Sequence, residues 1–325
     1  MVCCSRDLLG WLASSIINSI SVGSLYFVIS VGLTLTLAVI KLPNFAHAEF
    51  LTVGAYVGII ISALFPNNFV IVAAAAFCIC GAVALILHYV VYRPLMNRKV
   101  STYILVLASF AGAQFIRYGV FSGASIGNLL ASSPSLTLVP VASFANATIT
   151  NVNLISVGLT ISVAAFLALF LNFTIIGKSM RAVASNPDLA KLTGVNIVLV
   201  INVMWIIAGG LAGVGGVVFS VTTNVTPVLG LNALLDIFSV VIIAGLTSIT
   251  GTVIGAYVVA FSENTLMAFL NAYFAIPFSY SPIMPFILIV IILLFKPTGL
   301  APNSTSLLVA RNKIIGYFTK RSEKQ

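Results

Sequence analysis

Long apolar stretches alternate with short polar connections along this chain. A membrane-crossing α-helix needs about twenty apolar residues, because it rises about 1.5 Å per residue. The first stretch covers about 11–40, enough to cross with tilt or with a break at Gly23 or Gly32. Further stretches lie at about 45–64, 68–92, 101–121, 151–175, 197–220 and 282–296. The pattern predicts an all-α polytopic transmembrane helical bundle of roughly eight to ten spans.

The region near 232–270 has a different pattern, with the turn-prone segment Gly245 to Gly251 between two apolar arms. The first arm has about fourteen residues, which is short for a full crossing. We therefore expect a broken region whose first arm is a tilted or partly re-entrant helix, with a simple helix-packing turn as the alternative. Irregular backbone at membrane depth requires protein or water around it. The turn should face the protein interior or the cytoplasmic surface.

Composition supports a membrane protein, since 60% of the residues are hydrophobic, 6% are charged, and the mean hydropathy is +1.18. A soluble core of this size needs a polar shell that this chain lacks. We divide the chain into a transmembrane domain at 1–300 and a basic tail at 301–325. The tail could lie as an amphipathic helix on membrane lipid or remain solvated.

Basic residues occur in alternate connections, which predicts that these connections share the cytoplasmic face of the cell membrane. They are Lys41, Arg93, Arg98, Lys99, Lys178, Arg181, Lys191 and Lys296. The connections between them, at 65–68, 122–150, 221–231 and 271–281, carry no charge and should be external. Arg117 does not fit, because it falls near the outer end of its predicted helix, where it could snorkel to headgroups or line a polar path. The basic residues are not interleaved with aromatic residues, so we expect no nucleic-acid partner.

Three acidic residues lie within or beside predicted spans, and each is a site hypothesis because a buried charge is costly there. Glu49 follows His47 by two residues and lies close behind Lys41, so it is interpreted as an interface residue paired with a cation. Asp236 and Glu263 lie near opposite ends of the broken region. They could cap helices or pair with backbone amides.

No constellation for catalysis or metal binding is found in the sequence. The histidines, His47 and His88, lie on different predicted spans, and the cysteines have no further ligand at a metal-binding spacing. The triplet at 177–179 matches the end of a phosphate-binding loop, but Asn172 occupies the position where that loop needs glycine. We expect no metal, no cofactor and no enzymatic activity in this chain.

Four separated motifs, in the same order, resemble the branched-chain amino-acid permease family of ABC importers, the Liv-type inner-membrane permeases. The first combines Gly23-Ser-Leu-Tyr-Phe, Gly32-Leu-Thr-Leu, Asn44-Phe-Ala-His47-Ala-Glu49 and Gly54-Ala-Tyr56. The others are the polar insert 177–196, the segment Ala244 to Gly251 with Gly255, and Lys296-Pro-Thr-Gly-Leu300. Two positions depart from the family pattern: Ala48 replaces a glycine, and Ser185 stands where a glutamate is frequent.

The resemblance implies a permease for branched-chain or related amino acids. It also implies a homologous second permease, two cytoplasmic ATP-binding subunits that hydrolyse ATP, and an external substrate-binding protein. The insert 177–196 would then be a cytoplasmic coupling loop whose short helix, near Asn186 to Thr193, docks on an ATP-binding subunit. An Asn cap, Pro at the first helical position, an acidic first turn and a terminal Gly suit such a helix. The implied coupling residues are Arg181, Asn186, Pro187, Asp188, Lys191 and Gly194.

A solvated charged loop is the alternative interpretation of this insert. For the whole chain, the alternative is a self-sufficient secondary transporter or channel for a small polar solute, which would need its own coupling-ion or selectivity residues. The candidates for a pathway or for a structural motif are Asn44, His47, Glu49, Asp236, Gly245, Gly251 and Glu263. The choice among branched-chain amino acids, other amino acids, urea and short amides stays open.

Overall fold

The computed structural model describes residues 2–66, 68–132, 134, 139–144, 147–296 and 298–300, and the predicted basic tail at 301–325 lies outside them. In the first part of the chain the helices are α1 (Val2–Ile40), α2 (His47–Leu64), α3 (Phe69–Leu87), α4 (Arg93–Asn97), α5 (Thr102–Ile126) and α6 (Asn151–Phe173). They are followed by α7 (Ile175–Ser185), α8 (Pro187–Leu192), α9 (Ile197–Thr222), α10 (Leu229–Ala244), α11 (Ile249–Phe261), α12 (Met267–Phe274) and α13 (Met284–Phe295).

Short irregular turns join some of these helices into longer continuous segments. Two π-helical turns, η1 (His88–Tyr92) and η2 (Ser262–Leu266), connect α3 to α4 and α11 to α12, and a 3-10 turn, η3 (Phe278–Ile283), leads into α13. Within the described residues, eight segments are long and apolar enough to cross a membrane. They are Gly10–Ile40, His47–Leu64, Phe69–Asn97, Thr102–Ile126, Asn151–Phe173, Ile197–Thr222, Ile249–Phe274 and Phe278–Phe295. The predicted all-α polytopic bundle is confirmed.

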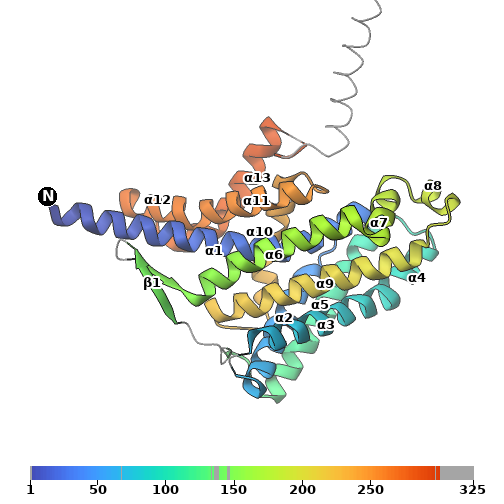
Figure 1. The fold of residues 1–325 in the computed structure, drawn as a ribbon, viewed down its shortest axis with the longest axis horizontal. Coiled ribbons are helices and arrows are strands. Elements are labelled where there is room, and N and C mark those ends of the chain that lie inside the picture. Colours follow the sequence, from blue (N-terminus) through green and yellow to red (C-terminus); the bar gives the residue numbers. More distant parts are fainter. Residues whose placement is uncertain are drawn as a thin grey trace, which may run out of the picture.

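The helices α1, α6 and α9 run side by side along the molecule (Figure 1). The segment Gly10–Ile40 of α1 is the most buried of the eight spans and packs against α6, α9, α10 and α11. It is unbroken at Gly23 and Gly32, so the break that these glycines would permit does not form. Both glycines instead allow close packing: a Cβ on Gly32 would lie 2.7 Å from the His47 ring, and one on Gly23 would lie 2.7 Å from the Tyr257 ring.

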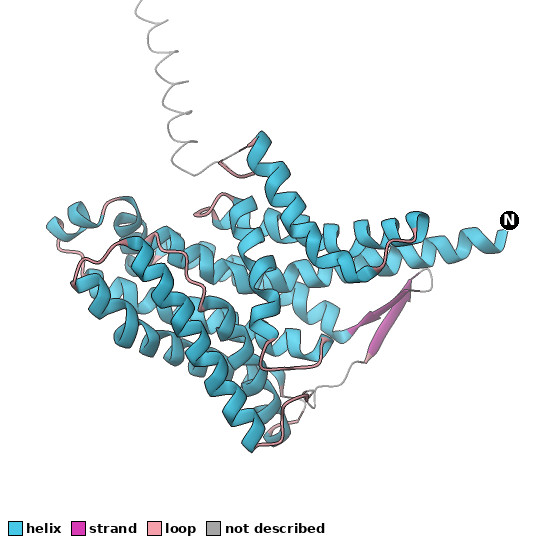
Figure 2. Ribbon diagram, turned by 180° about the vertical axis from the view of Figure 1, so that it is seen from behind, coloured by secondary structure: helices cyan, strands magenta, loops and turns pink. Residues whose placement is uncertain are grey.

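The connection between α5 and α6 contains a two-stranded antiparallel hairpin of β1 (Pro140–Phe144) and β2 (Ala147–Thr150). The sequence pattern did not predict these strands. The hairpin lies near the amino-terminal end of α1, whereas α4, α7 and α8 gather at the opposite end of the bundle (Figures 1 and 2). The basic connections around α4, α7 and α8 therefore share one end of the molecule, and the hairpin within the uncharged 122–150 connection lies at the other.

The connection 41–46 turns back into the bundle, so α2 does not start level with the end of α1. His47, the first residue of α2, bonds through Nε2 to the carbonyl of Ile29 at 2.9 Å. Ile29 lies about 16 Å from Ile40 along the axis of α1, since an α-helix rises about 1.5 Å per residue. The motif that begins at Asn44 is therefore inside the protein rather than at the cytoplasmic surface, where the sequence interpretation placed Glu49.

The predicted broken region is confirmed, with α10 as its short first arm of 16 residues. Its amino-terminal end contacts α2, where the Gly230 amide donates to Thr52 Oγ1 at 2.8 Å. It ends at Ala244, and the next residue, Gly245, has a φ of 100°, a left-handed conformation that glycine adopts readily. The second arm, Ile249–Phe274, is one continuous segment of spanning length that contains η2.

Candidate functional site

The polar insert forms two helices with the local structure that its sequence predicts. The Oδ1 atom of Asn186 accepts hydrogen bonds from the amides of Asp188 and Leu189, at 3.0 and 3.1 Å, and Pro187 is the first residue of α8. Gly194 has a φ of 82°, which suits the predicted stop. The predicted helix near 186–193 is thus confirmed as α8, with a cap at its start and a left-handed glycine after its end.

The surface of α8 combines charged and apolar side chains. Asp188 and Lys191 are exposed, and so are Leu189 and Leu192, which are 60% and 84% exposed. Ala190 is buried and fixes the opposite side of the helix against the protein. The two exposed leucines are three residues apart, so they lie on one face of α8 beside the charged side chains.

Arg181 and Gly177 belong to α7, which connects α8 to the bundle. Arg181 is exposed, and its Nη1 atom donates to Asn172 Oδ1 at 2.7 Å. Gly177 is helical and packs closely against the backbone of Phe170 and Leu171 at the end of α6. It belongs to a helix junction and not to a phosphate-binding loop.

Asn44 and His47 hold the connection 41–46 in place inside the bundle. Asn44 Oδ1 accepts from the Tyr92 hydroxyl at 2.6 Å and from the Ala46 amide at 3.1 Å. Both Asn44 and His47 are buried, and the His47 bond to Ile29 joins the start of α2 to α1. These contacts indicate that the first motif shapes the backbone at the centre of the bundle.

Glu49 forms an ion pair with Arg117 of α5, which confirms the expected pairing with a cation but corrects the expected position of Glu49 at the membrane interface and the expected snorkelling of Arg117. Arg117 Nε donates to Glu49 Oε1 at 2.9 Å, Nη2 also donates to this oxygen, and Thr52 donates to Oε2 at 3.2 Å. The cation partner is therefore Arg117 and not Lys41. Both residues are buried, so Arg117 does not snorkel to headgroups. A paired, hydrogen-bonded charge is the form in which ionised groups are tolerated in an apolar interior.

Asp236 and Glu263 meet at one hydroxyl group. Tyr26 of α1 donates to Asp236 Oδ2, at 3.2 Å, and to Glu263 Oε2, at 2.8 Å. The prediction that these acids cap helices or pair with backbone amides is therefore wrong. They join α10, η2 and the centre of α1 into one packed unit. Tyr26 was missed as a site residue, although it is part of the first sequence motif.

The end of α10 and the start of the turn from Gly245 to Gly251 pack against residues 299–300, which follow the last span. The Leu300 amide donates to the Ile243 carbonyl at 2.8 Å, and a Cβ on Gly299 would lie 3.0 Å from the carbonyl carbon of Ala244. Ser248 caps α11 by accepting from the Gly251 amide at 3.1 Å. The irregular backbone is thus partly satisfied by protein, as the sequence interpretation required.

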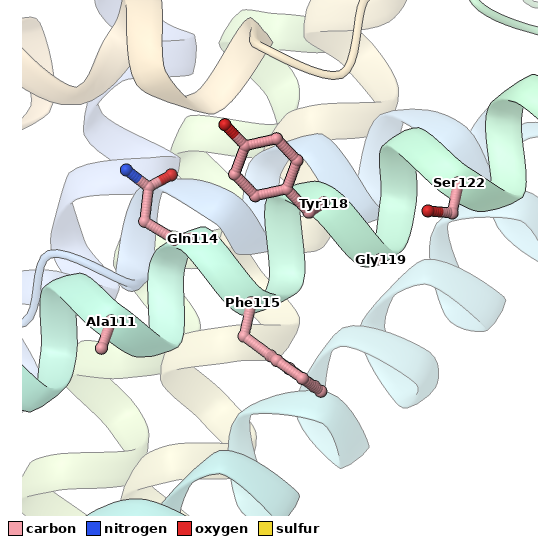
Figure 3. Close-up of a pocket in the computed structure, with 6 residues that line it drawn as sticks. All are labelled: Ala111, Gln114, Phe115, Tyr118, Gly119 and Ser122. Atoms are coloured by element: carbon pink, nitrogen blue, oxygen red, sulfur yellow. The ribbon is translucent and has the colours of Figure 1, made fainter.

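Within the part of the chain that the structure describes, no group of three or more His, Cys, Asp or Glu residues could hold a metal ion. A shallow open hollow of about 410 Å³ lies instead on the surface of α5 (Figure 3). Its lining combines polar and apolar side chains from a single helix: Ala111, Gln114, Phe115, Tyr118, Gly119 and Ser122.

Sequence reasoning did not find this hollow, and it left Arg117 unpaired. Arg117 and Glu49 are opposite charges at the depth of predicted spans, and the rule that intramembrane charges pair could have linked them. The hollow carries no comparable signal, because Gln, Tyr and Ser also occur in helix contacts. Only the folded chain separates exposed from covered positions on α5.

Comparison with known proteins gives consistent matches over nearly the whole chain. A family model described as "Branched-chain amino acid transport system / permease component" matches residues 15–293. The probable branched-chain amino acid transport permease protein LivH of Methanocaldococcus jannaschii is 28% identical over 286 residues, which cover 87% of this chain and 90% of that protein.

Bacterial relatives match over a similar length. The high-affinity branched-chain amino acid transport system permease protein LivH of Escherichia coli (strain K12) is 28% identical over 296 residues, which cover 87% of this chain and 93% of the relative. BraD of Pseudomonas aeruginosa, which carries the same description, is 26% identical over 301 residues, which cover 88% and 94%. The matched region includes the insert 177–196, the buried motif at 44–49 and the broken region.

Proposed function

Because the chain belongs to the branched-chain amino acid transport permease family, we propose that it is the permease subunit of an ABC importer and forms the translocation path for branched-chain or related amino acids. The family match over residues 15–293 is the observation that carries this proposal. Its relatives are named as transport permeases and not as enzymes. The relatives support this function rather than a self-sufficient secondary transporter or channel.

The energy source in this proposal is ATP hydrolysis by two cytoplasmic ATP-binding subunits. A homologous second permease completes the membrane part, and an external substrate-binding protein delivers the amino acid. These partners follow from the class of importer, since this chain has no phosphate-binding loop and Gly177 lies within a helix.

The coupling loop 177–196 is the proposed contact with an ATP-binding subunit. The capped helix α8 presents Asp188, Leu189, Lys191 and Leu192 on its exposed surface, which supports docking through both apolar and charged contacts. Closure of the ATP-binding subunits would then move α8 and α7 as a rigid unit. Because α7 packs on α1, α6 and α9, this movement would reach the centre of the bundle.

The proposed location is the cell membrane, with the coupling loop and the carboxyl terminus in the cytoplasm. The grouping of Arg93, Arg98, Lys99 and the 177–196 insert at one end of the bundle supports this orientation. In this arrangement residues 1–300 form the transmembrane domain and 301–325 form a cytoplasmic tail.

The proposal is tested by purifying the protein in mild detergent and identifying its companions by mass spectrometry. The wild type is compared with a Leu189→Asp, Leu192→Asp double variant, which places two charges on the exposed surface of α8. We expect ATP-binding subunits with the wild type and at least a tenfold smaller amount with the double variant, because each new charge would be desolvated on docking.

Ser101→Asp is the matched control, since Ser101 is also exposed, in the connection before α5. This variant should retain the ATP-binding subunits. Folding of all variants is compared by gel filtration and thermal unfolding. Absence of ATP-binding subunits from the wild type, even after gentle crosslinking, would argue against the importer assignment.

A further inference from the structure

One side of α3 is an apolar stripe that stays exposed along the whole helix. Its positions are four residues apart and so lie on one face, and its side chains are aliphatic apart from one cysteine: Val70, Ala74, Cys78, Ala82, Ile86 and Val90. From the first to the last of them the helix rises about 30 Å, which is also the thickness of the hydrocarbon core of a bilayer. The stripe therefore suits contact with lipid across the whole membrane.

A basic turn follows this stripe directly, at the end of the bundle where α4, α7 and α8 gather (Figure 1). Arg93, Arg98 and Lys99 are all exposed, and among the residues that the structure describes none of them forms an ion pair. Arg93 lies three residues beyond Val90, or about 5 Å further along the helix. This distance places it just outside the hydrocarbon, at the level of the lipid headgroups.

Arg93 is held beside the stripe by an aromatic ring. The Arg93 Cζ atom lies 4.9 Å from the centroid of the Tyr89 ring. The Tyr89 hydroxyl accepts a hydrogen bond from Asn202 Nδ2 at 2.8 Å, which ties the ring to α9. A cation–π contact positions a guanidinium group without neutralising its charge. Arg93 therefore remains a positive charge in a defined place.

Arg98 and Lys99 belong to an ordered turn at the end of α4. The Lys99 amide donates to the Met96 carbonyl at 2.9 Å, and the Val100 amide donates to the Leu95 carbonyl at 3.5 Å. These two bonds form a Schellman motif, in which Lys99 takes the left-handed position with a φ of 52°. The two cations are thus attached to a closed turn, close to Arg93 in the sequence.

We propose that Arg93, Arg98 and Lys99 bind the phosphate headgroup of an anionic phospholipid, and that an acyl chain of this lipid lies along the stripe on α3. Arginine binds phosphate oxygens through paired N–H donors, and lysine adds a point charge. Each cation near the membrane surface strengthens the attraction to an anionic lipid. The basic turn and the stripe meet in the same order as the headgroup and the chain of a lipid. This inference goes beyond the proposed transport function, because it does not depend on the solute.

The length of the connection favours a lipid over a protein partner at this turn. Only residues 98–101 separate the end of α4 from the start of α5, so the cations cannot extend far from the bilayer. The insert 177–196 is different, because it contains two helices, α7 and α8, outside the spanning segments. Its cations are carried away from the lipid-facing surface, whereas those of the basic turn continue that surface.

The proposal is tested by native mass spectrometry of the full-length protein, purified in mild detergent. Phosphatidylglycerol or phosphatidylcholine with the same acyl chains is added to the wild type and to two variants. Arg93→Gln, Arg98→Gln removes two charges from the basic turn. Lys178→Gln, Lys191→Gln removes two exposed charges from the same end of the bundle and is the matched control. Folding of all three proteins is compared by thermal unfolding.

We expect the wild type and the control to retain phosphatidylglycerol at least tenfold more strongly than phosphatidylcholine. The Arg93→Gln, Arg98→Gln variant should lose this preference, because the charges that distinguish the two headgroups are removed. Equal retention of the two lipids by the wild type would overturn the proposal. An equal loss in the control would also overturn it, since net charge and not this turn would then attract the lipid. Loss of a co-purifying protein from the Arg93→Gln, Arg98→Gln variant, with lipid binding unchanged, would identify the turn as a protein contact instead.

A second measurement locates the acyl chain and needs only the wild type. Phosphatidylglycerol and phosphatidylcholine analogues with a photoreactive group in the acyl chain are crosslinked to the protein in proteoliposomes, and labelled peptides are identified by mass spectrometry. The control is α13, whose exposed side chains are also apolar and whose end carries Lys296, bonded through Nζ to the Leu300 carbonyl at 2.8 Å. We expect the phosphatidylglycerol analogue to label α3 at least threefold more than α13, and the phosphatidylcholine analogue to label them equally. Equal labelling of α3 and α13 by both analogues would mean non-specific lipid contact and would refute the site.

Discussion

Glu49 and Arg117 neutralise each other across two helices that are far apart in the sequence. The arginine contacts one carboxylate oxygen and Thr52 contacts the other, so both oxygens of Glu49 are bonded. Removal of one partner leaves the other charge buried and unpaired, which is much more costly than replacing both by apolar residues. The pair is therefore sensitive to single substitutions.

Arg117→Leu should lower the free energy of unfolding by about 3–5 kcal/mol, and the Glu49→Leu, Arg117→Leu double variant should recover most of this loss. The measurement is the midpoint of thermal unfolding in detergent for the two variants and the wild type. Equal destabilisation by the single and double variants would mean that packing, and not charge, dominates at this position.

Substitutions around Tyr26 should have different effects from those at the Glu49–Arg117 pair. The two carboxyl groups there share a hydrogen-bond donor and have no counter-charge. Tyr26→Phe should destabilise the protein by about 1–3 kcal/mol, since the buried Glu263 and the half-buried Asp236 lose their hydroxyl partner.

Asp236→Asn and Glu263→Gln each remove any repulsion between the acids while keeping the shape. These two should leave ATP-dependent uptake largely intact, as measured in proteoliposomes. Complete loss of uptake in a correctly assembled variant would favour the alternative of a secondary transporter.

At the scale of helices, glycine allows the central helices to approach closely. Gly54 of α2 lies directly against the backbone of Gly213 in α9, and Gly216 lies against Leu51 of α2. Without a hydrophobic driving force between helices in lipid, such close packing is a main source of helix association. These positions should accept no side chain.

The pair Gly54 and Gly58 tests this, because both are on the same face of α2, one turn apart. A Cβ on Gly54 would lie 2.7 Å from the carbonyl carbon of Gly213, whereas a Cβ on Gly58 would have its nearest contact at 3.4 Å from Val217. Gly54→Ala should lower the unfolding midpoint and the yield of folded protein, and Gly58→Ala should change neither. Similar behaviour of the two variants in detergent would contradict this account of the α2 and α9 contact.

At the scale of the whole molecule, the distribution of charge sets the orientation in the membrane. The exposed residue Ser143 lies in the hairpin, and Lys178 lies in α7 at the opposite end of the bundle. In intact cells an impermeant thiol reagent should label Ser143→Cys and should label Lys178→Cys only after the cells are opened. The reverse pattern would invert the proposed topology and remove the coupling loop from the cytoplasm.

Features that depend on neighbouring residues could be read from the amino-acid sequence. The spans can be predicted from the apolar runs. The start and the end of α8 can be predicted from the cap at Asn186 and the glycine at 194, because helix ends depend on local backbone hydrogen bonds and conformation. The sequence motifs also identified the family. Each of these signals lies within one helix or one connection.

Contacts between groups that are distant in the sequence became known only from the folded chain. Glu49 and Arg117 are 68 residues apart, and Tyr26 and Glu263 are 237 residues apart. Their pairing depends on how the connection 41–46 re-enters the bundle and on how α10 packs between α1 and α2. Helix packing in three dimensions sets these contacts, and it also determines which face of α5 stays uncovered. Apolar periodicity cannot encode such contacts, because it specifies the length of each span but not its neighbours.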